Sequence, residues 1–321
     1  MSAVLILLAW SIEVAFGYSQ KIVSRIGHPV MWIGGFIAAI DQKIDREILT
    51  PEQQRFWGAV LVTIVLVAGI CTASIISISL SGSLFGFFLQ ALIASSLLAS
   101  RSLYSHVSAV ALALGAGDLQ AGRHNVGLIV GRDVQALDEA GVAGAAIESL
   151  AENASDGVIA PLFWGLIFGL PGLVAYKALN TMDSMIGHKS KSYFYVGWAA
   201  AKLDDIANWI PARITGFLIC LGALSISQCQ HALKVMRQDA TSHRSPNAGW
   251  PEAAMAGALN VRISGPRLYA DGYNFEPWLN EAGSNATKIH IEMALIIYCR
   301  AMVFAGVVLA IVALLTKLNH V

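Results

Sequence analysis

Long uncharged segments separated by polar stretches dominate the chain. No charged residue lies between Arg55 and Arg101, and as a helix this segment could cross the ~30 Å hydrocarbon core of a bilayer twice. Its natural turning point is Ser81-Gly82-Ser83, because glycine and serine favour turns. This pattern predicts transmembrane helices. Further apolar segments lie at residues 3–17, at residues 206–230 apart from Arg213, and at residues 293–316.

Residues 157–176 are also uncharged, but they contain Pro161, Pro171 and Gly172 along with other glycines. A broken or re-entrant helix fits this segment as well as a full span does. We therefore expect an all-α, polytopic integral membrane protein with about four to six spans and large ordered polar loops. We expect a single membrane domain over residues 1–321, with N-terminal spans at 1–100, a motif-bearing core at 101–292 and a C-terminal span at 293–321.

Composition supports this class and excludes others. The chain is 56% hydrophobic and 13% charged, with a mean hydropathy of +0.61, whereas about a quarter of the residues of soluble domains are charged. A formal net charge of zero gives no basis for nucleic-acid binding or for a strongly basic surface. The four cysteines form no CxxC pair, so neither a disulfide framework nor a zinc site is indicated.

A cluster of acids stands out in this apolar chain at residues 148–156. On a regular helix, Glu148, Glu152 and Asp156 would fall within about 80° of one another, with Asn153 beside them. Like charges at this spacing repel, so a divalent cation, a cationic substrate or paired arginines should offset them. The alternative is an ordinary solvated helix face.

Further polar motifs lie at the edges of the apolar segments. Clustered carboxylates without a matching set of histidines or cysteines suit Mg²⁺, and nearby arginines and lysines suit phosphate or carboxylate oxygens. Together they indicate phosphate-dependent chemistry, although ion-conducting membrane proteins also gather carboxylates. No Walker-type or strand-linked GxGxxG motif occurs. These motifs include Arg132-Asp133, Asp183-Ser184, Asp204-Asp205, Arg213 and Ser245-Pro-Asn-Ala-Gly-Trp250.

Two motifs allow alternative interpretations. His28, which precedes Pro29, could be a ligand or base, or it could mark a turn at the start of a helix. Asp204 and Asp205 could bind a metal, but adjacent residues on a helix point about 100° apart, so we expect only one of them to face a given site.

Several longer motifs follow one another along the chain. They include Val130-Gly-Arg-Asp133, Glu148-Ser-Leu-Ala-Glu-Asn153, Ala160-Pro-Leu-Phe-Trp164, Asp183-Ser-Met185, Leu203-Asp-Asp205, Asn208-Trp-Ile-Pro-Ala-Arg213 and Ser245-Pro-Asn-Ala-Gly-Trp250. This ordered series closely resembles the CobD/CbiB family of cobalamin biosynthesis, the adenosylcobinamide-phosphate synthases, which are multispanning membrane proteins. The resemblance covers about residues 101–270 and is collinear. The chain keeps His28-Pro29-Val30, departs from the family in the stretch before it, and carries Lys202 where members commonly have arginine.

This resemblance implies ATP-dependent amide formation, with Mg²⁺ and ATP as cofactors. The free propionate of adenosylcobyric acid would be joined to aminopropanol or to its O-phosphate, so a corrinoid, this amine and the lipid bilayer are the expected partners. The resemblance also implies a place in the cytoplasmic (inner) membrane, and other cobalamin-assembly enzymes are further candidate partners.

The chemistry implied by the resemblance suggests roles for the polar residues. We expect the acids to bind Mg²⁺ or the incoming ammonium, with one of them acting as a general base. Within the acidic set, the first three residues are the candidate Mg²⁺ ligands. The acidic set is Glu148, Glu152, Asp156 and Asp183. The expected binders of phosphate, propionate or other substrate groups are Arg132, Asn153, Lys177, Ser184, Arg213 and Asn247.

Other classes of protein remain as alternatives. A non-catalytic scaffold of a corrinoid-assembling complex would tolerate replacement of the acids. An ion-coupled transporter would use them as a cation path and should show repeated hydropathy in two halves, which the sequence lacks. An intramembrane zinc hydrolase would need histidines at metal-ligand spacing, which the sequence also lacks.

Overall fold

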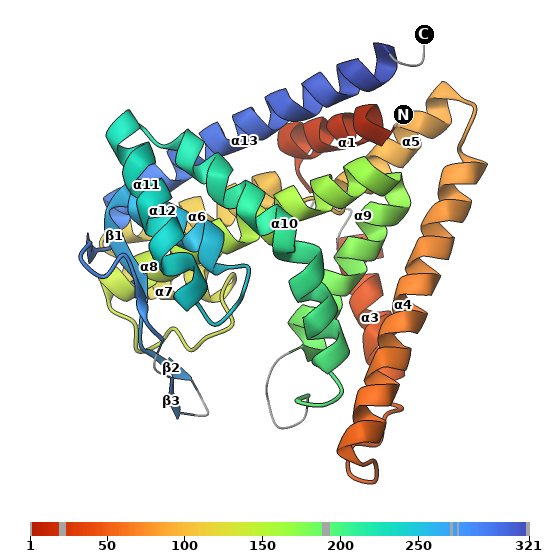
Figure 1. Ribbon diagram of the computed structural model, residues 1–321, viewed down its shortest axis with the longest axis horizontal. Helices are drawn as coiled ribbons and strands as arrows, with labels where there is room; N and C mark the ends of the chain where they lie inside the picture. The colour runs from red at the N-terminus through yellow and green to blue at the C-terminus, as the bar shows by residue number, and fades with distance from the viewer. Residues whose placement is uncertain (1, 19–23, 188–192, 270–271, 275, 319–321) are drawn as a thin grey trace. The chain divides into compact units, whose positions relative to one another are not determined.

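The computed structural model describes residues 2–18, 24–187, 193–269, 272–274 and 276–318, and it is predominantly helical (Figure 1). The chain divides into two compact units, each built from separated stretches of sequence. Unit 1 comprises Met1–Ala99, Ala160–Asn208 and Leu309–Val321, and unit 2 comprises Ser100–Ile159 and Trp209–Val308. The boundaries of the expected single domain and its three parts stay a prediction.

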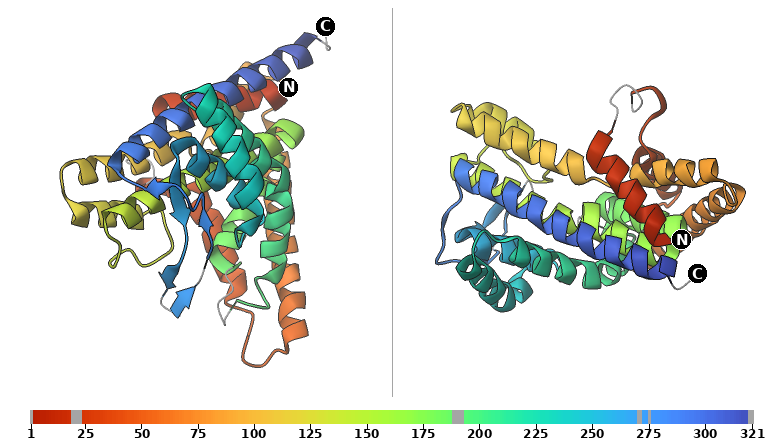
Figure 2. Two further views of the ribbon diagram at one scale, coloured as in Figure 1. Left: turned by 60° about the vertical axis from the view of Figure 1, so that its left-hand side comes forward. Right: turned by 90° about the horizontal axis from the view of Figure 1, so that it is seen from above.

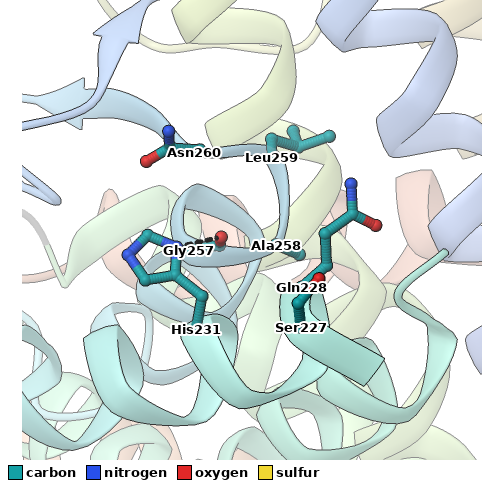
Figure 3. A pocket seen from close by; sticks show the side chains of 7 residues that line it. All are labelled: Ser227, Gln228, His231, Gly257, Ala258, Leu259 and Asn260. Atoms are coloured by element: carbon teal, nitrogen blue, oxygen red, sulfur yellow. Dashed lines mark hydrogen bonds between the residues drawn. The ribbon is translucent and has the colours of Figure 1, made fainter. Parts of the chain in front are cut away.

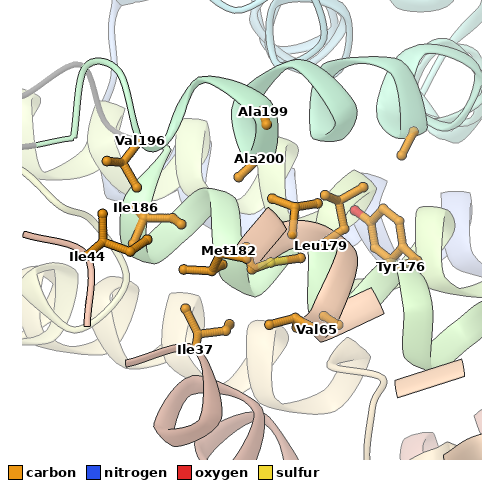
Figure 4. Close-up of a cluster of buried hydrophobic side chains, with 14 of the residues drawn as sticks. Ile37, Ile44, Val65, Tyr176, Leu179, Met182, Ile186, Val196, Ala199 and Ala200 are labelled. Atoms are coloured by element: carbon orange, nitrogen blue, oxygen red, sulfur yellow. The ribbon is translucent and has the colours of Figure 1, made fainter. Parts of the chain in front are cut away.

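Unit 1 has an apolar core between helices α4 and α9. Val65 of α4 packs with Leu179 and Met182 of α9, and Ile37 of α3 joins the same cluster (Figure 4). Helix α1 packs against α5 and α9. The elements of unit 1 are α1 (Ser2–Phe16), α3 (Pro29–Asp41), α4 (Pro51–Ser79), α5 (Leu84–Ser95), α9 (Ala160–Ile186), the first part of α10 (Trp198–Gly222) and the end of α13 (Lys288–Leu318).

The turn predicted between the first two long apolar helices is confirmed. Helix α4 ends at Ser79 and α5 begins at Leu84. Gly82 has a φ of 82°, a left-handed conformation that glycine adopts without steric cost. Ser83 caps α5 by accepting a hydrogen bond from the backbone N–H of Gly86. Local turn chemistry therefore explains where this apolar segment folds back.

The apolar segment after the acid cluster, for which a broken helix and a full span fitted equally well, contains a break. Within α9, Gly169 has φ 66° and ψ −150°, so the helix is interrupted there. Pro171 follows and has no N–H to donate to the preceding turn. Gly172 makes a close approach possible, since an added Cβ would lie 2.4 Å from the carbonyl oxygen of Trp164. Glycine and proline therefore produce a broken helix.

Unit 2 packs helices around a small sheet. Helix α11 packs on α12, and α6 packs against α7 and α8. Strand β1 pairs antiparallel with β4 and parallel with β5, while β2 and β3 form a separate antiparallel pair (Figure 2). The elements are α6 (Ser100–Gly115), α7 (Leu119–Gly127), α8 (Glu139–Ala154), a π-helical turn η1 (Ser155–Ile159), α11 (Ile226–Asp239), a 3₁₀ turn η2 (Ala240–Ser242), α12 (Gly249–Leu259), β1 (Val261–Ser264), β2 (Arg267–Tyr269), β3 (Gly272–Asn274), β4 (Trp278–Leu279), β5 (Ser284–Asn285) and the remaining parts of α10 and α13.

Among the residues that the structure describes, four helical segments are long and apolar enough to span a membrane. They confirm the class of helical membrane protein, whereas the number of segments that cross stays a prediction. Two shorter apolar helices, Ser2–Phe16 and Trp209–Gly222, add to them within the described part of the chain. The four are Pro51–Ser79, Leu84–Gly115, Glu139–Ile186 and Lys288–Leu318.

The close approach at Gly58 gives a testable prediction about unit 1. A Cβ added at Gly58 would lie 2.0 Å from the backbone oxygen of Val196, so Gly58→Ala should force α4 away from this segment. We expect a loss of about 1–3 kcal/mol of stability, as for other overpacked positions. Gly35→Ala is the control, because nothing lies within 4 Å of its added Cβ. Thermal unfolding in detergent, followed by circular dichroism, should separate the two variants, and equal midpoints would contradict the prediction.

Candidate functional site

The predicted site residues fall into two groups, one in each unit. Unit 1 carries three of them, Lys177, Asp183 and Ser184. No group of three histidine, cysteine, aspartate or glutamate side chains within the described ranges is placed to hold a metal ion. The residues of unit 2 are Arg132, Glu148, Glu152, Asn153, Asp156, Arg213 and Asn247.

Glu148 of α8 lies at the centre of a buried network in unit 2. Its side chain is 10% exposed, and its Oε2 accepts a hydrogen bond from Arg132 Nη2 at 3.0 Å. Its Oε1 accepts one from the backbone N–H of Ser264 at 2.8 Å. The Glu148 carboxylate therefore joins the segment before α8 to the end of strand β1. The positive charge of Arg132 balances the negative charge of Glu148. Arg132 is thus one of the arginines expected to offset the repulsion between the clustered acids.

The backbone at Ser264 is in an unfavourable conformation. Its φ of 66° lies in the left-handed region, which costs a non-glycine residue about 1–3 kcal/mol. Its hydroxyl donates to Glu276 Oε2 at 3.5 Å, and Arg244 Nη1 lies 3.3 Å from Glu276 Oε1. Two carboxylates, each near an arginine, thus hold the backbone N–H and the hydroxyl of Ser264. A non-glycine residue held in this way is typical of functional sites.

A buried histidine–carboxylate pair lies at the start of α12. His243 Nε2 is 3.7 Å from Glu252 Oε2, and both side chains are at most 5% exposed. His243 Nδ1 accepts a hydrogen bond from the backbone N–H of Ser245 at 3.1 Å. The buried Asn247 belongs to the same turn, since its backbone N–H donates to Ser245 Oγ.

Sequence reasoning missed several members of these networks. It selected Asn247 from the Ser245–Trp250 motif but not the flanking His243 or Glu252. Ser264 ends strand β1 and Glu276 lies shortly before β4, and no periodic pattern in the sequence indicated either residue. Closeness to the recognised Ser245–Trp250 motif was the available signal for His243 and Glu252, which lie two residues before and after it.

The remaining residues of the acid cluster do not share the environment of Glu148. Glu152 is exposed, whereas Asp156 and Asn153 are half-buried. Asn153 Nδ2 donates to the backbone oxygen of Ser149 at 2.9 Å. Asp156 lies in the π-helical turn η1, whose wider i→i+5 spacing departs from the regular helix that the expected stripe assumes. Glu152 and Asp156 are thus the acids of this cluster that are more open to a ligand.

Arg213 is stacked between two tryptophans. Its Cζ lies 4.1 Å from the ring centroid of Trp209 and 4.4 Å from that of Trp250. Its Nη1 donates to the backbone oxygen of Trp209 at 2.6 Å. Gly216 permits the approach of α12, because an added Cβ would lie 3.1 Å from the Trp250 backbone oxygen. The stack holds the guanidinium plane fixed, and among the described residues its Nε and Nη2 have no hydrogen-bond acceptor.

A second buried acid lies in unit 1. Asp204 is 7% exposed, and its Oδ2 accepts a hydrogen bond from Asn208 Nδ2 at 2.9 Å. Tyr176 in turn donates its hydroxyl proton to Asn208 Oδ1 at 2.8 Å. Asp205 instead lies near the exposed Lys202, at 3.9 Å. The expectation that only one of these adjacent acids faces inward is confirmed.

Burial and charge alter the protonation of Asp204, which lies before the apolar part of α10. Burial, followed by the negative charge of Asp183, raises the pKa of Asp204 to about 7. The Asn208 hydrogen bond lowers this pKa, the charge of Asp205 raises it, and the Asn180 amide lowers it. Near neutral pH, the protonated and the ionised forms of Asp204 are therefore both populated.

The interpretation of His28 as a helix start is confirmed. His28 caps α3, and its Nδ1 accepts a hydrogen bond from the backbone N–H of Val30 at 3.3 Å. Burial, followed by the positive charge of Lys177, lowers the pKa of His28, so the imidazole is neutral at pH 7. Ser184, which lies in the same helix as Lys177, is exposed and donates its hydroxyl proton to the backbone oxygen of Asn180.

A hollow in unit 2 lies apart from the predicted residues. Its lining comes from α11 and the end of α12 and includes Ser227, Gln228 and Asn260 (Figure 3). His231 Nδ1 lies 2.9 Å from the backbone oxygen of Gly257, as the dashed line in Figure 3 marks. None of the predicted site residues lines this hollow.

The apolar helices and the buried acid networks together define a polytopic helical membrane protein with ionisable groups inside each unit. The family model described as CobD/Cbib protein matches residues 6–298, and the chain belongs to this family. Relatives named "Cobalamin biosynthesis protein CobD" include one from Rhodobacter capsulatus, 46% identical over 99% of both chains, and one from Rhizobium meliloti, 43% identical over 97% of this chain and 98% of the relative. No solved structure matches the chain significantly.

The Glu148 network gives a prediction about stability. Glu148→Gln would leave Arg132 buried without its balancing charge, and breaking a buried ion pair in this way typically costs about 3–5 kcal/mol. The control is Glu292→Gln, which breaks the exposed pair with Lys288 and should cost less than about 1 kcal/mol. Unfolding in detergent by heat or denaturant measures both. Similar midpoints for the two variants would show that the Glu148 pair does not stabilise unit 2.

Proposed function

We propose that this protein is an ATP-dependent amide ligase of the cytoplasmic membrane. It would join aminopropanol, or its O-phosphate, to the free propionate of adenosylcobyric acid. The observation that carries the proposal is the similarity of the chain, over 99% of its length, to a protein named for cobalamin biosynthesis. The buried acids and the stacked arginine support it, because the reaction needs a proton acceptor and a receptor for carboxylate or phosphate oxygens.

The chemistry sets clear demands on the protein. A carboxylate is a poor acylating agent, so it must first be converted to an acyl phosphate or a similar species by transfer of a phosphoryl group. Bound Mg²⁺ would neutralise the charge that develops on that group. The amine then forms the C–N bond while the C–O bond to phosphate breaks. This requires oriented anions and a group that removes a proton from nitrogen.

The acids of unit 2 fit Mg²⁺ with one adjustment to the expected ligand set. Glu148 already binds Arg132 and the backbone of Ser264, so its role is to position these segments. The exposed Glu152 and the half-buried Asp156 would supply the oxygen donors. Mg²⁺ commonly uses one or two carboxylates and completes its coordination with water and substrate phosphates, so two protein ligands would suffice.

Among the cations, Arg213 is the best candidate for holding an anionic substrate group. The Glu148 carboxylate already balances Arg132, whereas the Arg213 guanidinium is fixed between two indole rings with open N–H donors on its edge. A planar guanidinium can bind a carboxylate or phosphate through two parallel hydrogen bonds. Within unit 2, Asn153 and Asn247 would orient the substrate through hydrogen bonds. In unit 1, Lys177 would supply a positive charge and Ser184 a hydroxyl for substrate groups that reach that unit.

The reaction itself is the first test. Wild-type protein in proteoliposomes should form the amide from adenosylcobyric acid, aminopropanol phosphate, ATP and Mg²⁺, with product separated by chromatography and phosphate release measured in parallel. Glu152→Gln should reduce the rate at least ~100-fold if this carboxylate binds the metal or acts on a proton. Glu281→Gln, which changes an exposed glutamate in unit 2, is the control and should retain the rate.

The outcomes separate the alternatives. Product from wild type and from the control, but not from Glu152→Gln, supports the ligase and places Glu152 in its site. Equal product from all three removes Glu152 from the chemistry. No product from any of them would contradict a self-sufficient ligase and would favour the scaffold, which needs a catalytic partner.

Arg213 provides a second prediction. Arg213→Lys keeps the positive charge but loses the planar stack and the paired donors. We expect KM for the corrinoid carboxylate to rise about tenfold or more, since a charged hydrogen bond contributes roughly 1.5–3 kcal/mol. Arg300→Lys, at an exposed position of α13, is the matched control. An unchanged KM in Arg213→Lys, measured by initial rates over a range of corrinoid concentrations, would remove Arg213 from substrate binding.

A further inference from the structure

Unit 1 contains a buried carboxylate, that of Asp204, one of whose oxygens lacks a well-formed hydrogen bond. Asp204 Oδ1 is buried and no donor among the described residues reaches it with ordinary hydrogen-bond geometry, whereas Oδ2 accepts a hydrogen bond from Asn208. The side chain of Asn180 still interacts with the carboxylate and lowers its pKa, but burial and the charge of Asp183 outweigh this effect. Asn208 is itself 1% exposed and held by the Tyr176 hydroxyl, so the position of Asp204 is fixed. A buried carboxylate oxygen without a donor is costly when ionised, so such a group readily takes up a proton or a cation.

Asp183 of α9 makes Asp204 part of a pair. The negative charge of Asp183 acts directly on Asp204, whereas Asp183 itself is only half-buried. Two neighbouring carboxylates repel each other, so a proton or a cation that reduces their combined charge is favoured. The charge of Asp205 also raises the pKa of Asp204, whereas the side-chain amides of Asn208 and Asn180 lower it. The pair thus combines an inner group that can hold a proton with a more accessible group that can meet a cation.

We propose that Asp183 and Asp204 together form the proton acceptor for the amine, with Asp183 contacting the ammonium group and Asp204 holding the proton. This inference rests on the proposed ligase function. The substrate class for this pair is a primary alkylammonium. Asp204 was not among the predicted site residues, and the proposal gives it a catalytic role. Asp183 keeps its expected role as an acid that binds the ammonium group.

The step balances in protons and bonds. The ammonium nitrogen gives one proton to the carboxylate pair and becomes a neutral amine with a free electron pair. That electron pair forms the C–N bond at the activated acyl carbon, and the C–O bond to the phosphate breaks. The second proton leaves nitrogen with the departing phosphate. The acyl phosphate comes from the ATP-dependent first step of the proposed function.

The pH dependence has a defined sign. Below about pH 7 Asp204 already holds a proton and cannot accept another, so the rate should rise as the pH increases through about 7. A primary ammonium, like that of lysine, has a pKa near about 10, so free amine is scarce at neutral pH without a base. Loss of the base should therefore be overcome at high pH, where the amine is already deprotonated.

The test is the pH–rate profile of amide formation by the full-length protein in proteoliposomes, with free aminopropanol as the amine. Asp204→Asn should lose at least ~100-fold in rate at pH 7, and its rate should rise instead toward the pKa of the amine. Asp205→Asn, at a partly exposed position, removes a negative charge that raises the pKa of Asp204, so its profile should move to lower pH. Glu52→Gln, an exposed acid at the start of α4, is the control and should keep the wild-type profile.

Each outcome decides the proposal. A folded Asp204→Asn variant that keeps the rise near pH 7, or that stays inactive at high pH, would overturn it. If Asp204→Asn does not fold, Asp205→Asn decides, because an unshifted profile in that variant rejects the pair and a shift to lower pH supports it. Failure of the ligase proposal looks different, since wild type would then give no product at any pH.

Discussion

The cost of enclosing charge in an apolar protein is the constraint on which this structure depends. An ionised side chain removed from water must find an opposite charge, a set of hydrogen bonds or a proton. Glu148 meets this demand with Arg132 and the Ser264 N–H, and Glu276 meets it with Arg244 and the Ser264 hydroxyl. These contacts fix the strained end of β1. The same interactions that make the charges tolerable therefore also hold the irregular part of unit 2 in place.

The constraint also distinguishes structural acids from candidate reactive ones. A carboxylate whose two oxygens are both occupied, such as Glu148, has little capacity left for a ligand. Asp204 has one oxygen without a normal hydrogen bond, and burial favours its protonated form. Arg213 shows the converse for cations, since two aromatic faces stabilise its charge while leaving its N–H edge open. Incompletely paired groups keep more capacity for chemistry than fully paired ones, which is why our proposals centre on Asp204 and Arg213.

Local chemistry explains which predictions from the sequence succeeded. The turn at Gly82 was expected and is confirmed, while the break at Gly169 and the helix start at His28 were each one of two open alternatives. All three follow from the conformational limits of glycine or proline or from a side-chain cap. The acid cluster was recognised, but its geometry was not. The π-helical turn at Asp156 and the pairing of Glu148 with a strand more than a hundred residues away leave no trace in local spacing.

The sequence by itself determined the helical membrane class, the family and the residues that carry its motifs, because hydropathy, turn chemistry and collinear motifs are properties of the chain taken in order. Only the tertiary structure decided which ionisable groups are paired and which keep capacity for a ligand. That property depends on partners supplied by distant segments, as Ser264 is for Glu148 and Asp183 is for Asp204. Burial and pairing control the charge of a side chain, and neither is encoded in its immediate neighbours.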